Sequence, residues 1–426
     1  MAKATQVNDK PHTPLAAYGQ AALKTNKLHG ADARDQLRFG LFGEVGSLLS
    51  MVKKEHRDLE TADHNAITEE IGDALWYLAN VADKYETSLQ AAGVEAMQEL
   101  QIRMEVNRVV AAEVTFEEFD GLLQLSSRKL ETLDRAVHLR MLAAHAGQLL
   151  SAAPDTTDLL SQPPQHLLGH LLADLAMVAA LYKQQLSEIA DANLRKIRSR
   201  WPGEDPEYLP FFDEKKFSEL ERFPREEFDM HFIETTPPDG GSPYVIQRLH
   251  GINIGDRLTD NRADPDGYRF HDVFHLAYMT HLGWSPVIRS LLKLKRKSNR
   301  KFDEEEDGAR AAIIEEAIST WIFNHAHARD YFKTKQQGRL SYDLLKQVHD
   351  MVKGYEVHEC PLWQWERAIL DGFSIFRDLM ANRGGIVRIN LAARTIKFVP
   401  AERHAEPPPP LVPQEPLVGT LPPAGL

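Results

Sequence analysis

Residues 69–82 read EEIGDALWYLANVA, in which polar side chains recur every three or four positions within an apolar run. That period is typical of an amphipathic α-helix, because residues three and four apart lie on the same face. The core face is expected to carry the apolar residues Ile71, Leu75 and Leu78. The opposite face is predicted to carry a polar stripe two to three turns long. Its members are Glu70, Asp73, Tyr77, Asn80 and Lys84.

A further acid, Glu44, lies in an earlier stretch whose apolar residues also have helical spacing. If the two helices pair antiparallel, Glu44 meets Glu70 and Asp73. Three converging carboxylates repel one another unless a cation neutralises them. Oxygen ligands favour Mg²⁺ or Mn²⁺ over zinc. The three acids are therefore candidate metal ligands.

Hard cations in such sites usually bind phosphate oxygens as well, so the predicted substrate is a nucleotide or another polyphosphate. A basic cluster follows Glu44 by two to four turns and could reach the outer phosphates. Its members are Lys53, Lys54, His56 and Arg57. The competing interpretation is a solvated helix start, because the helix macrodipole favours acids in a first turn. The candidate substrate-binding residues are Lys53, Lys54, Arg57, Asn80 and Lys84.

Two short sequence matches recur at one offset of 101 residues. GEVGSLLS at 43–50 matches AHAGQLLS at 144–151, and EEIGDAL at 69–75 matches HLLADLA at 170–176. The second copy has His145 in place of Glu44, and it keeps an aspartate, Asp174, in place of Asp73. The pattern predicts a pseudo-dimer of two helical hairpins with a single working site, because packing the hairpins together buries both apolar stripes.

The apolar period is close to 3.6 along most of the chain, which predicts an all-α fold. Residues 1–115 and 116–210 are assigned to the two repeats, the second one degenerate, and residues 217–399 to a separate, mainly helical domain. Residues 400–426 are rich in proline and predict a disordered or polyproline tail. The break between the repeats and the C-terminal domain is expected in residues 201–210, because basic residues followed by proline end the preceding helix.

Composition excludes several classes of protein. The 426 residues include 62 acidic and 50 basic side chains, and the net charge of −12 argues against a protein that coats DNA or RNA. No stretch of about 18 apolar residues occurs and the N-terminus is polar, so we expect no membrane segment and a cytoplasmic location. Cys360 is the single cysteine, which excludes an internal disulfide. Homo-oligomerisation stays open.

The stretch GLFGEVGSLLSMVKKEHRD, followed by EEIGDALWYLANVADKYETSL, resembles the MazG-like all-α nucleoside triphosphate pyrophosphohydrolase family. SEIADANLRKIRSRWP, residues 187–202, is similar to that family's closing helix. The resemblance covers roughly residues 15–205. It implies Mg²⁺-dependent attack of water between the α and β phosphates, which gives a nucleoside monophosphate and pyrophosphate.

Position by position, the resemblance assigns Glu44 to the first metal-binding glutamate, and Glu70 and Asp73 to the Glu-x-x-Asp pair. Ser47 departs from the pattern because it stands where the family has a second glutamate and supplies no charge. Glu44 and Glu70 are both candidates to accept the proton of the attacking water. Glu69 is a candidate substitute for the missing acid.

The C-terminal half contains a second candidate site. In YRFHDVFHLAYMTHLGW, residues 268–284, two histidines lie one turn apart on a helix predicted to end at Gly283. A second helix supplies two adjacent glutamates. The set predicts a second metal site, although the residues are also compatible with core or surface roles, and an HD-type phosphohydrolase would need a further His and Asp that the sequence does not place. The candidate ligands are His271, Asp272, His275, Glu315 and Glu316.

Between these two helices the basic run at 293–301 is followed directly by the acidic run at 303–307, a pattern typical of a solvated charged loop. For the whole chain, the main hypothesis is a Mg²⁺-dependent nucleoside triphosphate pyrophosphohydrolase with its active site at Glu44, Glu70 and Asp73. The alternative is a nucleotide-sensing regulatory or defence protein, in which the N-terminal bundle binds nucleotide but cleaves it weakly and the C-terminal domain acts as effector.

Overall fold

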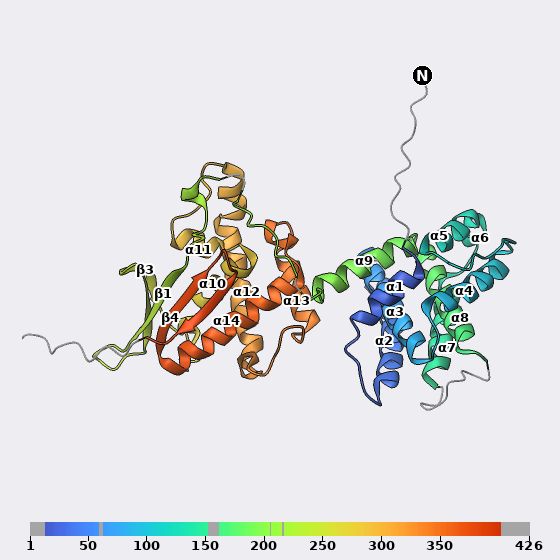
Figure 1. Ribbon diagram of the computed structural model, residues 1–426, viewed down its shortest axis with the longest axis horizontal. Coiled ribbons are helices and arrows are strands. Elements are labelled where there is room, and N and C mark those ends of the chain that lie inside the picture. Colours follow the sequence, from blue (N-terminus) through green and yellow to red (C-terminus); the bar gives the residue numbers. More distant parts are fainter. Residues whose placement is uncertain (1–12, 59–62, 152–161, 205, 215–216, 402–426) are drawn as a thin grey trace, which may run out of the picture. The chain divides into compact units, whose positions relative to one another are not determined.

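The computed structural model describes residues 13–58, 63–151, 162–204, 206–214 and 217–401, without the side chains of residues 54–56 and 58. The chain divides into two compact units, Met1–Pro206 and Glu207–Leu426, each with its own hydrophobic core (Figure 1). The tail that the sequence predicts from residue 400 lies outside the described residues apart from its first two positions. Within the described residues, none of the helices combines the length and the apolar character needed to cross a bilayer.

The described part of the N-terminal unit is built from helices, in agreement with the periodicity of its sequence. Helix α3 begins after Asp63, whose side chain accepts hydrogen bonds from the backbone N–H groups of Asn65 and Ala66 and so caps the helix. The apolar faces of the helices meet in one core. The helices are α1 (Leu15–Lys24), α2 (Ala33–Asp58), α3 (His64–Lys84), α4 (Leu89–Met104), α5 (Phe116–Leu125), α6 (Ser127–Leu130), α7 (Arg135–Ser151), α8 (Pro164–Leu181) and α9 (Leu186–Arg200).

The order of helices in this unit repeats. Helices α1 and α5 have equal lengths, and both their first and their last residues lie 101 positions apart. The residues that precede these two helices, Pro14 and Thr115, form an antiparallel β-bridge with each other. Helix α3 packs against α9, and α8 packs against α4. If α1–α4 are taken as the first half of the unit and α5–α9 as the second, the last helix of each half packs against the other half.

Two glycines allow close helix contacts around α3. A Cβ atom on Gly40 would lie 2.1 Å from the ring of Tyr77, so glycine lets this ring lie directly on α2. A Cβ atom on Gly72 would lie 3.0 Å from the Cβ of Asn193, so α3 and α9 also approach closely there. These contacts bring the polar stripe of α3 against both α2 and α9.

The C-terminal unit contains a five-stranded antiparallel sheet of order β3-β2-β1-β4-β5, so the all-α prediction is wrong for this unit. Alternating burial along β1 shows the period of two that the helical interpretation of the sequence missed. The strands are β1 (Phe228–Thr235), β2 (Tyr244–Leu249), β3 (Ile252–Leu258), β4 (Gly384–Asn390) and β5 (Thr395–Val399).

Helices of the C-terminal unit cover this sheet, and α10 and α14 contact β4 and β5 (Figure 1). Helix α10 ends at Gly283, which has a φ of +70°, as the sequence predicts for a C-terminal cap. Helices α10 and α14 also pack against each other in the core. The helices are α10 (Asp272–Leu282), α11 (Pro286–Leu291), α12 (Ala309–His327), α13 (Tyr342–Met351) and α14 (Leu362–Asn382).

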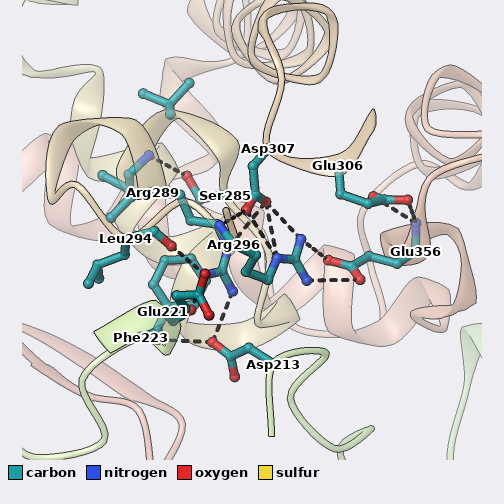
Figure 2. A network of polar contacts seen from close by, with 12 residues as sticks. Asp213, Glu221, Phe223, Ser285, Arg289, Leu294, Arg296, Glu306, Asp307 and Glu356 are labelled. Carbon is teal, nitrogen blue, oxygen red and sulfur yellow. Dashed lines mark hydrogen bonds and ion pairs between the residues drawn. The ribbon is translucent and has the colours of Figure 1, made fainter. Parts of the chain in front are cut away.

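The charged segment between α11 and α12 is largely exposed, as the sequence predicts, except for Arg296 and Asp307, which are almost completely buried. The Arg296 guanidinium lies between the carboxylates of Asp307 and Glu356 (Figure 2). Its Nη2 is 2.7 Å from Asp307 Oδ1 and 2.7 Å from Glu356 Oε1. Arg289 lies beside this pair and contacts Asp213 at 2.9 Å. One residue from each run, Arg296 and Asp307, therefore forms a buried ion pair that fixes the chain where α12 begins.

Candidate active site

The structure brings the carboxyl groups of Glu44 in α2 and Glu70 in α3 together, beside Asp73. Burial, the neighbouring Glu70 carboxyl group and the charge of Asp73 raise the pKa of Glu44 to about 8. The helix-pairing prediction from the sequence therefore agrees with the structure at these three acids.

Helix α9 supplies two further side chains to the acids. Lys196 Nζ lies 2.5 Å from Asp73 Oδ2 and 3.0 Å from Glu69 Oε1. Asn193 Nδ2 donates a hydrogen bond of 3.0 Å to Asp73 Oδ1. Both oxygens of Asp73 are thus held from α9, and Lys196 places a cation beside the acids.

A buried tyrosine fixes Asn193 in turn. The hydroxyl of Tyr18, in α1, donates to Asn193 Oδ1 at 2.8 Å and lies 3.4 Å from the backbone carbonyl of Gly72. Burial and the charge of Asp73 hold the pKa of Tyr18 well above its usual range, so this hydroxyl stays protonated and remains a donor. The chain of contacts from Tyr18 through Asn193 orients the Asp73 carboxylate.

Sequence reasoning missed Lys196, Asn193 and Tyr18. On sequence alone, the segment ANLRKIRSRWP is assigned to the end of a helix and to the family's closing helix. It is given no role at the acids. Its basic residue at position 196 was the available signal, since a cluster of acids needs a compensating charge.

The other predicted substrate-binding residues have different environments. Asn80 is completely buried and donates to the Trp76 carbonyl of its own helix, so its amide is not presented at the surface. Lys84 lies 3.5 Å from Asp83. Lys53 and Arg57 are exposed on α2, and the side chain of Lys54 lies outside the described residues.

The acids fit a hard divalent cation. Their donors are carboxylate oxygens, the ligand type that Mg²⁺ and Mn²⁺ prefer. The raised pKa of Glu44 beside Glu70 and Asp73 marks a place where a cation would relieve carboxylate repulsion. Ser47 lies one turn after Glu44 and is half-buried, so it can contribute a hydroxyl but no charge.

In the second copy, ion pairs replace the acidic cluster. His145 Nδ1 lies 2.6 Å from Asp174 Oδ2, and Arg103 of α4 lies 2.5 Å from Asp174 Oδ1. Asp174 is completely buried, and Arg103 also contacts Glu99 at 2.7 Å. Asp174 therefore contacts a basic side chain, Arg103, from α4, just as Asp73 contacts Lys196 from α9. Arg103 and His145 each contact one oxygen of Asp174.

The C-terminal candidates also converge. His271 and His275, at the start of α10, face Glu315 and Glu316 of α12, with His275 Nδ1 2.8 Å from Glu315 Oε1. Ligand atoms of His271, His275 and Glu316 lie within 4.8 Å of one another. Asp272 adjoins them, with Oδ1 3.2 Å from His271 Nε2.

Residues 207–402 match the family model described as the MazG C-terminal domain. The match supports a MazG-related C-terminal domain. It lies in the C-terminal unit, so the carboxylate cluster of the N-terminal unit is outside it. Neither the curated proteins nor the solved structures contain a match to the chain.

Proposed function

We propose that the protein is a Mg²⁺-dependent nucleoside triphosphate pyrophosphohydrolase whose active site is the cluster of Glu44, Glu70 and Asp73. The observation that carries the proposal is the convergence of Glu44, Glu70 and Asp73 from two helices, since such crowding of acids costs folding energy. The MazG-related C-terminal domain supports a role with nucleotides.

The lysine beside the acids suits a polyphosphate substrate. Lys196 Nζ contacts Asp73 and Glu69 in the structure, and 21% of its side chain is exposed. When a cation neutralises Asp73, this ammonium group becomes available to phosphate oxygens. The site would then combine acids that hold a cation with a lysine that binds the anionic substrate.

Bound Mg²⁺ would supply charge neutralisation on the phosphate oxygens and activation of the attacking water. Glu44 and Glu70 are both candidates to take the proton of that water, and Glu44 can do so only after the cation has displaced the proton that it holds in the metal-free site. The water oxygen bonds to the α phosphorus, and the bond from that phosphorus to the bridging oxygen breaks. Pyrophosphate leaves and a nucleoside monophosphate remains.

Asn193 and Tyr18 act as positioning residues in this scheme. Asn193 holds one oxygen of Asp73, and the buried Tyr18 hydroxyl fixes the orientation of the Asn193 amide. The other oxygen of Asp73 contacts Lys196. Asp73 is therefore preorganised before substrate binds, which is what an electrostatic site requires.

The alternative is nucleotide sensing with weak cleavage, and Ser47 favours it, because a hydroxyl in place of an acid reduces the charge available to hold cations. The two functions share a binding site and differ in turnover. In the sensing alternative, Glu44 and Asp73 would hold a nucleotide–Mg²⁺ complex without efficient hydrolysis.

The test is pyrophosphate release by the full chain from a panel of NTPs and dNTPs with Mg²⁺. We expect turnover by the wild type and its loss in Glu44→Gln and Glu70→Gln. Asp83→Asn is the matched control, because Asp83 is an exposed acid on the same helix as Glu70. Binding of nucleotide without pyrophosphate from any substrate would favour the sensing alternative, and neither binding nor release would reject both.

A further inference from the structure

Two histidines of the C-terminal unit are held with one ring nitrogen each directed to the same place. His271 immediately precedes α10, and His275 lies one turn further along, in the segment HDVFH. Their spacing of four residues places both rings on one side of the helix. Histidine pairs with this spacing are a frequent arrangement for binding a metal ion.

In each of the two histidine rings, Nδ1 is already held by a hydrogen bond. His271 Nδ1 donates to the backbone carbonyl of Tyr268 at 2.8 Å, and the two rings stack with centroids 4.2 Å apart. His275 Nδ1 donates to Glu315 Oε1 at 2.8 Å. With Nδ1 of each ring held in this way, Nε2 is the nitrogen that each histidine can offer to a metal ion.

Glu315 is itself held firmly, because its carboxylate accepts from Ser285 Oγ at 2.6 Å and from the backbone N–H of Val287 at 2.9 Å. Both Glu315 and His275 are completely buried. A buried carboxylate that orients a histidine in this way is the usual support for a metal-binding imidazole.

The other ring nitrogens, Nε2 of both histidines, lie near the Glu316 carboxylate. Its Oε2 lies 3.4 Å from His275 Nε2 and 3.9 Å from His271 Nε2. A metal ion with bonds of about 2.1 Å holds its ligand atoms roughly 3–4 Å apart, so this spacing fits a shared ion. His275 Nε2 is buried and makes no hydrogen bond among the described residues.

His271, Asp272 and Glu316 line a cleft of about 1000 Å³ whose other walls come from the β2–β3 hairpin and the helices α11 and α12. Asp272 keeps one oxygen near His271 while the other accepts from Gln247 Nε2. The remaining walls are largely apolar and include Leu249, Ile252, Ile254, Leu258, Leu291 and Ile313.

We propose that His271, His275 and Glu316 bind a divalent transition-metal ion of the zinc type, with an open coordination position that faces this cleft. Two imidazoles and one carboxylate leave room for a water or ligand atom, as metal sites that act on substrates require. The imidazole nitrogens select against Mg²⁺, so this centre differs in chemistry from the all-oxygen cluster of the N-terminal unit. The proposal goes beyond the pyrophosphohydrolase function and does not depend on it.

The test is a titration of the full, chelator-treated chain with Zn²⁺ against a chromophoric chelator, repeated with Co²⁺ to record its visible absorption. The wild type should bind one equivalent at this centre. His271→Gln and Glu316→Gln should weaken that binding by at least about 100-fold. The Glu316 side chain is 44% exposed, so its replacement leaves the fold intact, which circular dichroism checks.

Two controls separate this centre from other sites. His250 also lines the cleft but is exposed, and His250→Asn should bind Zn²⁺ like the wild type, since asparagine tolerates the φ of 49° at this position. Glu44→Gln should also keep the Zn²⁺ equivalent while losing pyrophosphate release, so the two proposals can fail independently. A wild type that binds neither Zn²⁺ nor Co²⁺, or ligand variants that bind like it, would overturn the metal centre and leave His275 as a protonated partner of Glu316.

Discussion

Lys196 Nζ lies 2.5 Å from Asp73 Oδ2, although the two residues are 123 positions apart in the sequence. The contact joins the last helix of the second half of the N-terminal unit to the acidic helix of the first half. It makes the second half part of the candidate active site, although that half has His145 at the position that corresponds to Glu44. Several outcomes depend on this arrangement.

Replacing Lys196 with methionine should lower kcat/KM for nucleotide hydrolysis by about 10- to 100-fold, the range that one charge-assisted contact to phosphate contributes. Arg195→Met is the matched control, because Arg195 is an exposed base next to Lys196 on α9. Steady-state pyrophosphate release measures both variants. Equal activity of the two would remove Lys196 from substrate binding.

The acidic cluster should make the metal-free protein less stable as the pH rises. The pKa of Glu44 is raised from 4.5 to about 8, so the folded state holds a proton that the unfolded state releases between these values. Its contribution to stability is therefore present below pH 4.5 and is lost as the pH rises towards 8. Melting temperatures in a chelator should show this loss in the wild type, and a flatter profile in Glu44→Gln.

Binding of Mg²⁺ should release a proton at neutral pH, because the pKa of Glu44 is about 8 and the cation replaces the proton that Glu44 holds. Calorimetry in two buffers of different ionisation enthalpy measures the number of protons released. Glu44→Gln should bind Mg²⁺ more weakly and release none. Proton release that is unchanged in this variant would show that another group is responsible.

Removal of the charge of Asp174 should affect stability much more than removal of the charge of Asp73. Asp174→Asn should destabilise the protein by about 3 kcal/mol, because Arg103 and His145 lose a buried partner. Asp73→Asn should change stability by less than about 1 kcal/mol, because the lost Lys196 contact is offset by reduced repulsion among the acids. It should nevertheless abolish pyrophosphate release. Urea unfolding followed by circular dichroism compares the two variants, and equal destabilisation would contradict this difference in role.

The buried charges between α11 and α12 should carry stability in the C-terminal unit. Asp307→Ala should cost about 3–5 kcal/mol, because Arg296 loses a partner in a fully buried position. Glu304→Ala removes an exposed partner of Arg300 and should cost less than about 1 kcal/mol. Thermal unfolding measures the difference, and similar costs would mean that Asp307 is solvated like Glu304.

The sequence predicted the helices of the N-terminal unit because their apolar residues keep a period of 3.6 over many turns. It also predicted the meeting of Glu44 with Glu70 and Asp73, since two long amphipathic helices joined by a short connection pair antiparallel. The approach of Lys196 was not predictable in this way. It depends on the packing of α9 against α3, which Gly72 permits and which no local pattern records.

The sheet was missed for local reasons. The β2–β3 turn uses His250 and Gly251, both with positive φ, in place of the Asn-Gly pair that usually signals a two-residue hairpin. Strands β4 and β5 are short and follow directly after a long helix, so their period of two covers few residues. The burial of Arg296 was missed for a related reason, because it depends on partners as distant as Glu356.

One measurement bears on the proposed activity above all others: ³¹P NMR of a nucleoside triphosphate turned over by the wild type with Mg²⁺ in ¹⁸O-labelled water. Attack at the α phosphorus predicts equal amounts of monophosphate and pyrophosphate, with the label in the monophosphate and no turnover by Glu44→Gln. Nucleoside diphosphate and phosphate as products, or turnover that persists in Glu44→Gln, would contradict the assignment of the active site to Glu44, Glu70 and Asp73.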